Sequence, residues 1–348
     1  MATVKRWAVL SASATALVLT GVSVTQAATI TVATYGGEWG DAIRDCLTEP
    51  YTKATGNAVT PEPGVAGVTL AKLKQQAGNP TIDVAWLDGG VSELAGQADV
   101  LEPLDPTAIP NLEKVIPEGI YKRPDASIYA VSTGFYALGL VYNTKETKTA
   151  PTSWNDLWSP EYAGVVTIPS PSNAMGVPFV YAINQEQGGT SADFTPGFEK
   201  LKTLEVYSYF PSSGNATNSF QSGEVIIGAH YASAAWAMKD KGLPVAYVVP
   251  KEGALGGDIR LHITKGTKHL KEAQEFVNFV LEPKQAACMS DRLYIGPATV
   301  GAELSPEAQK RMPWGEAGSI KNLLITDWDD VNAKRSAIND QWNKTLAR

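Results

Sequence analysis

Segments with strand patterns and helix patterns alternate along this chain, and this alternation restricts the fold more than any other feature. Thr31–Thr34 has a strand pattern, and apolar side chains at helical spacing follow over Asp41–Thr55. A short helix is predicted over Val68–Ala77 and a buried strand over Ile82–Leu87. Strands that are separated by helices favour a parallel sheet covered by helices, so we predict the α/β class.

Two of these predicted strands end in loops that combine glycine with aromatic or acidic side chains. The first loop contains Tyr35, Gly36, Gly37, Glu38 and Trp39, and the second contains Asp88 and Gly89. Ligands of open parallel sheets bind outside the carboxyl ends of the strands, and glycine lets the backbone approach a ligand closely. A tight turn without a ligand is the alternative for the first loop, but the repetition in the second favours a binding site.

The rest of the chain continues the alternation. Ser127–Lys145 is long and rich in β-forming residues, with Gly134 and Gly139 inside it, so it is expected to carry the chain between two lobes. Another strand, predicted over Val225–Ala229, leads into Tyr231. The sequence contains no internal repeat and no low-complexity linker, so the lobes are expected to be interleaved. We assign residues 28–135 and 258–305 to lobe 1, and residues 136–257 and 306–348 to lobe 2.

The first 27 residues have the pattern of a secretory signal peptide. Lys5 and Arg6 precede an apolar stretch over Trp7–Thr20, and small residues lead to a cleavage point after Ala27. A retained membrane anchor is the alternative. Cleavage would leave 321 of the 348 residues and change the formal charge from -7 to -9, because both basic residues are removed. An acidic secreted chain argues against nucleic acid as a partner.

Motifs of catalysis and metal binding are missing from the sequence. His230, His262 and His269 lie far apart and have no carboxylate at metal-ligand spacing. There is no nucleophile elbow, phosphate-binding loop or dinucleotide fingerprint. We therefore predict no catalytic residue, no metal and no cofactor. Cys46 and Cys288 form an even pair in an exported chain, which permits one disulfide; two buried free thiols are the alternative.

Aromatic and charged side chains at the loops are the candidate binding groups. Tyr35 and Trp39 offer ring faces for a cation, although core packing is also open for Trp39. Asp88 is expected to accept from an ammonium group, and Tyr231 to form the opposite wall. Arg260 stands between two apolar residues of a predicted strand, where a guanidinium would clamp a carboxylate or form an ion pair.

Several segments together resemble the periplasmic solute-binding proteins of ABC importers, above all the spermidine/putrescine-binding family. They are TYGGEWGDAIRDCLTEPYTKATG, IDVAWLDGG, ALGLVYNTK, TSWNDLWSPEYAGVVTIP, SFQSGEVIIGAHYASAA, VVPKEGALGGDIRLHITKG and AQEFVNFVLEPKQAA. The resemblance covers nearly all of residues 29–348. It implies a type II fold, in which two α/β lobes with mixed sheets are joined by crossover strands and close on a ligand.

The resemblance also suggests roles for individual residues. Tyr35 stands where these proteins have an aromatic residue, Asp88 where they have a serine that contacts ligand, and Tyr231 where they have a stacking tryptophan. Their Trp-x-Asp motif corresponds here to the region of Asp258. Their acidic run corresponds to SPSNAMG, which contains Asn173 and no acid.

These differences bear on the ligand. A buried dication needs two counter-charges, whereas this site offers Asp88, Glu38 and Asp258 together with a cation at Arg260. The sequence therefore predicts a small amine or zwitterion, similar to a polyamine or an ω-amino acid, and argues against iron. The expected partners are this solute and the permease and ATPase subunits of the importer, with the protein a monomer in the periplasm. A ligand-presenting sensor subunit and a periplasmic hydrolase are the alternatives.

Overall fold

The computed structural model describes residues 2–3, 27–316 and 318–346. Almost all of the predicted signal peptide, residues 1–27, lies outside the described part of the chain. Among the described residues, no helix has both the length and the apolar character needed to cross a membrane. The fold is α/β, as the alternating patterns predict.

The described residues form a 12-stranded mixed sheet. Its strands are β1 Thr29–Thr34, β2 Ala58–Pro63, β3 Val84–Asp88, β4 Leu101–Glu102, β5 Ile120–Lys122, β6 Ile128–Asn143, β7 Val166–Pro169, β8 Val206–Phe210, β9 Ile227–Tyr231, β10 Val245–Val248, β11 Ala254–Thr264 and β12 Leu323–Ile325.

Helices cover this sheet. The α-helices are α1 Gly37–Ile43, α2 Glu49–Thr55, α3 Ala66–Gln75, α4 Val91–Gln97, α5 Gly176–Glu186, α6 Thr195–Lys202, α7 Ser213–Ser222, α8 Ala232–Asp240, α9 Leu270–Val280, α10 Pro283–Leu293, α11 Pro306–Lys310 and α12 Trp328–Thr345. A π-helical segment, η1 Arg44–Thr48, joins α1 to α2. Short 3-10 turns are η2 Pro110–Lys114, η3 Pro117–Gly119, η4 Trp154–Trp158, η5 Pro160–Tyr162 and η6 Ile320–Asn322.

The strand order separates two parallel regions by an antiparallel centre. Along the main path the order is β2-β1-β3-β11-β6-β9-β7-β8. Strand β1 is parallel to β2 and β3, and β7 is parallel to β8 and β9. The central strands β11 and β6 pair antiparallel with each other and with their outer neighbours. Each half of the sheet therefore presents the carboxyl ends of its parallel strands at one edge, where ligands of α/β proteins bind.

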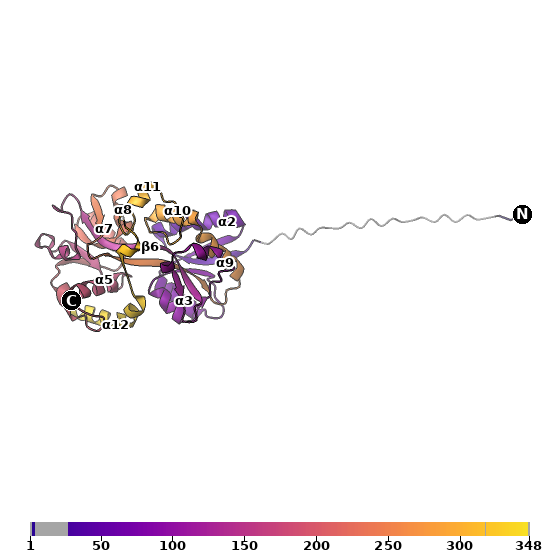
Figure 1. Ribbon diagram of the computed structural model, residues 1–348, viewed down its shortest axis with the longest axis horizontal. Coiled ribbons are helices and arrows are strands. Elements are labelled where there is room, and N and C mark those ends of the chain that lie inside the picture. The colour runs from indigo at the N-terminus through magenta and orange to yellow at the C-terminus, as the bar shows by residue number, and fades with distance from the viewer. Residues whose placement is uncertain (1, 4–26, 317, 347–348) are drawn as a thin grey trace.

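Strand β6 connects the two halves, as Figure 1 shows. It spans 16 residues and is mostly buried, which explains its continuous apolar run. Gly134 and Gly139 do not interrupt it. They let neighbours approach, since an added Cβ would lie 2.7 Å from Ile295 and 2.6 Å from Tyr247, respectively. The predicted crossover strand is thus present, while the predicted division into lobes at fixed residues stays a prediction.

The helix predicted over residues 41–55 is longer and not uniformly α-helical. It runs from α1 through η1 to α2, and Pro50 stands in the first turn of α2, where its missing N–H is tolerated. Within it, Tyr51 is fully buried and Ala54 is exposed. The helix ends at Gly56, whose φ of 80° is left-handed. In the next helix, α3, Ala77 lies beyond the last turn and is exposed.

Two long-range connections hold helices near the two ends of the chain in place. A disulfide joins Cys46 in η1 to Cys288 in α10, with the Cα atoms 5.7 Å apart. At the other end, α12 packs on α5 and α6. There the Tyr181 hydroxyl donates to Asp330 at 2.9 Å, and Tyr209 packs edge-on against Trp342.

Candidate functional site

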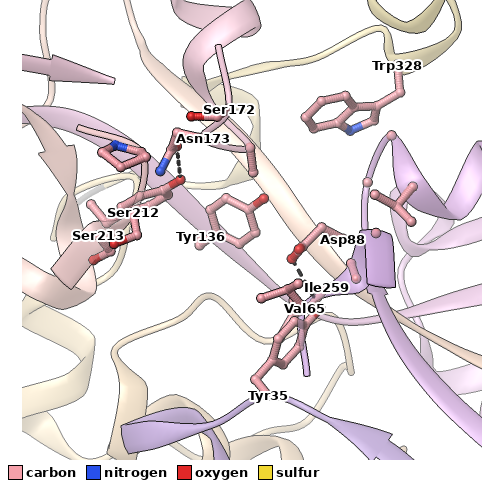
Figure 2. A pocket seen from close by; sticks show the side chains of 18 of the residues that line it. Tyr35, Val65, Asp88, Tyr136, Ser172, Asn173, Ser212, Ser213, Ile259 and Trp328 are labelled. Atoms are coloured by element: carbon pink, nitrogen blue, oxygen red, sulfur yellow. Dashed lines mark hydrogen bonds between the residues drawn. The ribbon is translucent and has the colours of Figure 1, made fainter. Parts of the chain in front are cut away.

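A cavity of about 680 Å³ lies where loops from both halves of the sheet meet. Figure 2 labels ten of its lining residues, with Tyr35 and Asp88 on one side and Asn173, Ser212 and Ser213 on another. The lining residues are Tyr35, Trp39, Val65, Ala66, Gly67, Asp88, Gly89, Gly90, Val91, Leu94, Tyr136, Ser172, Asn173, Ala174, Pro211, Ser212, Ser213, Tyr231, Ser233, Ile259, Trp328, Asn332 and Arg335.

Asp88 provides the acidic group of the cavity. It ends β3, which lies parallel and next to β1, so the loop carrying Tyr35 is its neighbour. The Tyr35 hydroxyl donates to Asp88 Oδ1 at 3.1 Å (Figure 2). Burial raises the pKa of Asp88 to about 6, although the Tyr35 hydrogen bond opposes the rise. The negative charge of nearby Asp258 contributes to this rise in pKa, and the positive charge of Arg260 opposes it. A cation beside Asp88 would relieve that burial cost.

Two pairs of aromatic rings form walls of the cavity. Tyr35 packs edge-on against Trp39, with ring centroids 5.8 Å apart, and Tyr136 packs in the same way against Tyr231. The Tyr231 hydroxyl donates to Asn173 Oδ1 at 2.7 Å. The buried Tyr136 hydroxyl has no hydrogen-bond partner among the described residues. These rings offer π faces to a cation, and Tyr136 offers an unused donor to a ligand.

The indole of Trp328 lies against the backbone that follows Asp88. A Cβ at Gly89 would lie 2.2 Å from Trp328 Nε1, so only glycine permits this contact. Gly90 is also required by its φ of 90°. The Asn332 side chain donates to the Gly90 carbonyl at 2.8 Å. The glycines that the sequence associates with a ligand therefore let a tryptophan of α12 approach and hold the Asp88 loop.

Arg260 and Asp258 face away from this cavity, which contradicts their predicted contact with a ligand. In β11 the register pairs Ile259 with Asp88, and Ile259 lines the cavity. Because side chains alternate along a strand, its two neighbours point to the other face. There Arg260 Nε donates to Asp258 at 3.0 Å, and the guanidinium also pairs with Glu93. Arg260 therefore forms ion pairs, but they are buried and not at the surface as the ion-pair alternative expected.

This buried cluster has a further partner. The Tyr121 ring lies under the Arg260 guanidinium, 3.4 Å from the guanidinium carbon to the ring centroid. The Tyr121 hydroxyl donates to Asp258 at 2.7 Å. Burial lowers the pKa of Arg260, but the adjacent carboxylates outweigh this and the net shift is upward. Two carboxylates and one guanidinium leave net negative charge behind Asp88, which favours a cation in the cavity.

The other residues of the first loop form the start of helix α1 or a surface ion pair. Gly36 caps α1, and Gly37 begins α1 with a φ of 61°. Neither is among the residues that line the cavity. Glu38 is exposed and pairs with Lys241 beyond α8 at 3.0 Å. The predicted ligand contacts of these three residues are therefore not supported, while Tyr35 and Trp39 do line the cavity.

Family membership follows from comparison with known proteins. Residues 79–334 match the model of the family described as bacterial extracellular solute-binding protein. The chain belongs to this family. This confirms the predicted resemblance, and with it the two-lobed binding-protein fold.

The relatives of this solute-binding protein cover most of its length. The spermidine/putrescine-binding periplasmic protein 1 of Haemophilus influenzae is 30% identical, over 83% of this chain and 79% of that protein. A Salmonella typhimurium protein, named as a candidate 2-aminoethylphosphonate-binding periplasmic protein, is 24% identical over 85% of each chain. The crystal structure of an ABC transporter substrate-binding protein from Bradyrhizobium japonicum has a TM-score of 0.79 and 22% identity, over 92% of this chain and 99% of that one.

Several lining residues of this solute-binding protein carried no signal in the sequence. Tyr136 is one aromatic among many in the β-rich crossover segment. Trp328 and Arg335 belong to a polar C-terminal helix whose pattern indicates a solvated surface. Ser212 and Ser213 sit before and at the start of α7 in a glycine-bearing segment that matches no binding motif. The packing of α12 on α5 and α6 and against the Asp88 loop brings this helix to the site.

The histidines lie in separate places. His262 is buried, between Ser92 Oγ at 2.9 Å and the Ala85 carbonyl at 3.0 Å. His230 is buried beside Thr217, and His269 is partly exposed beside Asp83. Burial lowers the pKa of both His230 and His262 to about 3, so both are neutral. Within the described residues, no cluster of three potential ligands that could hold a metal ion is found.

Proposed function

We propose that this protein captures a small amine-bearing solute in the periplasm and delivers it to the permease of an ABC importer. The observation that carries the proposal is Asp88, a carboxylate at a cavity wall among aromatic rings. Its only hydrogen bond within the described residues comes from a neutral phenol, so no resident cation neutralises it directly. An ammonium ion would supply that charge.

The chemistry of the relatives supports an amine. One is named for spermidine and putrescine and another for 2-aminoethylphosphonate, and all three compounds contain a primary amine. Tyrosine and tryptophan rings on several sides of Asp88 can add cation–π attraction of about 0.5–2 kcal/mol each. A cation also lowers the pKa of Asp88, so the carboxylate would be fully ionised in the complex at neutral pH.

Delivery to a permease requires two conformations that differ in affinity. Binding shifts the balance toward the closed form only by the extra contacts made there. Tyr35 and Asp88 come from one half of the sheet, and Asn173 and Tyr231 from the other, so one ligand can touch both. We further propose that the protein acts as a monomer and that residues 1–27 are removed on export. Its partners are the permease and ATPase subunits.

A hydrolase is the weaker alternative. The described residues include one buried serine–histidine pair, Ser92 and His262, but neither residue lines the cavity. His262 Nδ1 faces the Ala85 carbonyl, so this ring nitrogen donates and Nε2 accepts from Ser92. A sealed pair of this kind has no access to a substrate, and we propose that the protein is not an enzyme.

The test is ligand-induced thermal stabilisation of the mature protein after it has been unfolded, washed free of solute and refolded. Putrescine, spermidine, γ-aminobutyrate, 2-aminoethylphosphonate, dicarboxylates and sugars form the panel. A ligand at about 100 times its Kd should stabilise by about 2.7 kcal/mol, a shift of a few degrees at this size. Asp88→Asn should abolish the shift, whereas Asp340→Asn, on the exposed side of α12, should not. Stabilisation by amine-free compounds alone would refute the amine assignment.

A further inference from the structure

We propose that Arg335 binds the acidic end of the solute, so that the ligand is a small zwitterion with an amine at Asp88 and a carboxylate or phosphonate at Arg335. This inference rests on the proposed function and narrows its ligand class. It assigns to the C-terminal helix the anion-binding role that the sequence had suggested for Arg260.

One face of α12 is directed at the Asp88 loop. Trp328 packs on Gly89, and Asn332, four residues later, donates to the Gly90 carbonyl. Arg335 follows three residues after Asn332, so the spacing i, i+4, i+7 places all three on the same face. All three line the cavity. The helix rise from Trp328 to Arg335 is about 10 Å, so Arg335 lies farther from the Asp88 loop than Trp328 does.

Arg335 has no hydrogen-bond or ion-pair partner among the residues that the structure describes. Among the described arginines, each of the others forms a hydrogen bond or an ion pair: Arg44, Arg123, Arg260, Arg292 and Arg311. No hydrogen bond, ion pair or ring contact involves Arg335 within the described residues, and the side chain is half-buried. Burial lowers its pKa. A partly desolvated guanidinium without a carboxylate is unfavourable unless a ligand supplies the anion.

The charges of the cavity match a zwitterion and not a dication. Of the described residues that line it, Asp88 is the single acid and Arg335 the single base. A diamine would pair one ammonium with Asp88 and leave the other near a guanidinium. An amino acid or aminophosphonate satisfies both charges. Ser213, at the start of α7, lines the same cavity and offers a hydroxyl donor to an acid oxygen, whereas the Ser212 hydroxyl donates to Asn215.

Calorimetric titration tests the assignment. Wild-type protein, Arg335→Gln, Arg335→Lys and the control Lys334→Gln, on the neighbouring position of α12, are each titrated with γ-aminobutyrate, β-alanine, 2-aminoethylphosphonate, putrescine, butylamine, butyrate and ethylphosphonate. Circular dichroism first confirms that every variant is folded. We expect the wild type to prefer a zwitterion, and Arg335→Gln to weaken its binding roughly 10- to 100-fold. Arg335→Lys should fall between them, and Lys334→Gln should match the wild type.

The outcomes separate this inference from the proposed function. Unchanged zwitterion affinity in Arg335→Gln, or wild-type preference for putrescine over every zwitterion, would overturn the role of Arg335 while leaving an amine receptor. Butyrate and ethylphosphonate carry no amine, so their binding tests Arg335 alone. If the wild type binds either acid and Arg335→Gln does not, the anion site is supported. This holds even if the Asp88→Asn experiment shows that the protein binds no amine. Failure of all seven compounds to bind the wild type would overturn both.

Discussion

Asp88 should reduce the stability of the ligand-free protein, so its replacement by asparagine should stabilise it. The ordinary pKa of this carboxyl is 3.8, and burial raises it to about 6. A difference of about two pKa units corresponds to about 3 kcal/mol at a pH above both values. Asp88 is partly exposed, so solvent should screen part of this cost. We therefore expect Asp88→Asn to raise the free energy of unfolding by about 1–3 kcal/mol at pH 7.

The pH dependence gives this prediction its sign. The folded state keeps its proton up to about pH 6, whereas the unfolded chain loses it near pH 4. The cost is therefore fully present above about pH 6, and it disappears as the pH falls through 4, because both states are then protonated. The stability gained by Asp88→Asn should shrink over that interval. An amide at this position still accepts from Tyr35, so the hydrogen bond is retained.

Urea unfolding followed by circular dichroism measures the effect, with solute-free protein at pH 4, 5, 6, 7 and 8. Asp340→Asn is the matched control, because this exposed carboxylate of α12 should change stability by less than about 0.5 kcal/mol. Asp88→Asn should unfold at higher urea than the wild type at pH 7 and at similar urea near pH 4. A variant that is less stable at pH 7, or a gain that is independent of pH, would refute the reasoning.

Three further substitutions test the site and its support. Tyr35→Phe removes the phenol that donates to Asp88; the pKa of the carboxyl should rise further, and amine affinity measured by calorimetry should fall roughly 3- to 10-fold, more at pH 6 than at pH 8. Arg260→Met leaves its two buried carboxylate partners unpaired, and the free energy of unfolding measured in urea should fall by about 3–5 kcal/mol. Replacing Cys46 and Cys288 by alanine removes a bond between residues 242 apart in the chain, and should cost about 2–5 kcal/mol in the same assay.

Each of these three experiments has a matched control. Tyr207→Phe changes an exposed phenol and should leave amine affinity unchanged. Arg44→Met breaks exposed ion pairs and should cost less than about 1 kcal/mol. The oxidised wild type, compared with the same protein under reductant, should reproduce the effect of the cysteine variant. Equal losses in Arg260→Met and Arg44→Met would contradict the account of the buried cluster.

The sequence alone predicted those features that depend on residues close together in the chain. Alternating patterns predicted the α/β class, because hydrophobic periodicity is a property of residues that are close together in the sequence. Tyr35 and Asp88 were found at the ends of their strands because parallel neighbours bring their carboxyl ends to one edge. The conspicuous composition of these loops therefore identified one wall of the cavity.

Only the tertiary structure shows which residues beyond Tyr35 and Asp88 face the cavity. Arg260 was assigned to the ligand because a strand pattern shows that Ile259 and Arg260 face opposite ways, but not which of the two faces the cavity. The pairing of β11 with β3 settles this and directs Ile259 inward. Arg335 lies on a polar helix far along the chain from Asp88, and it reaches the cavity because α12 packs on α5 and α6 and Trp328 packs on Gly89. Helical periodicity cannot predict such a contact, because the contact depends on how elements far apart in the sequence pack together.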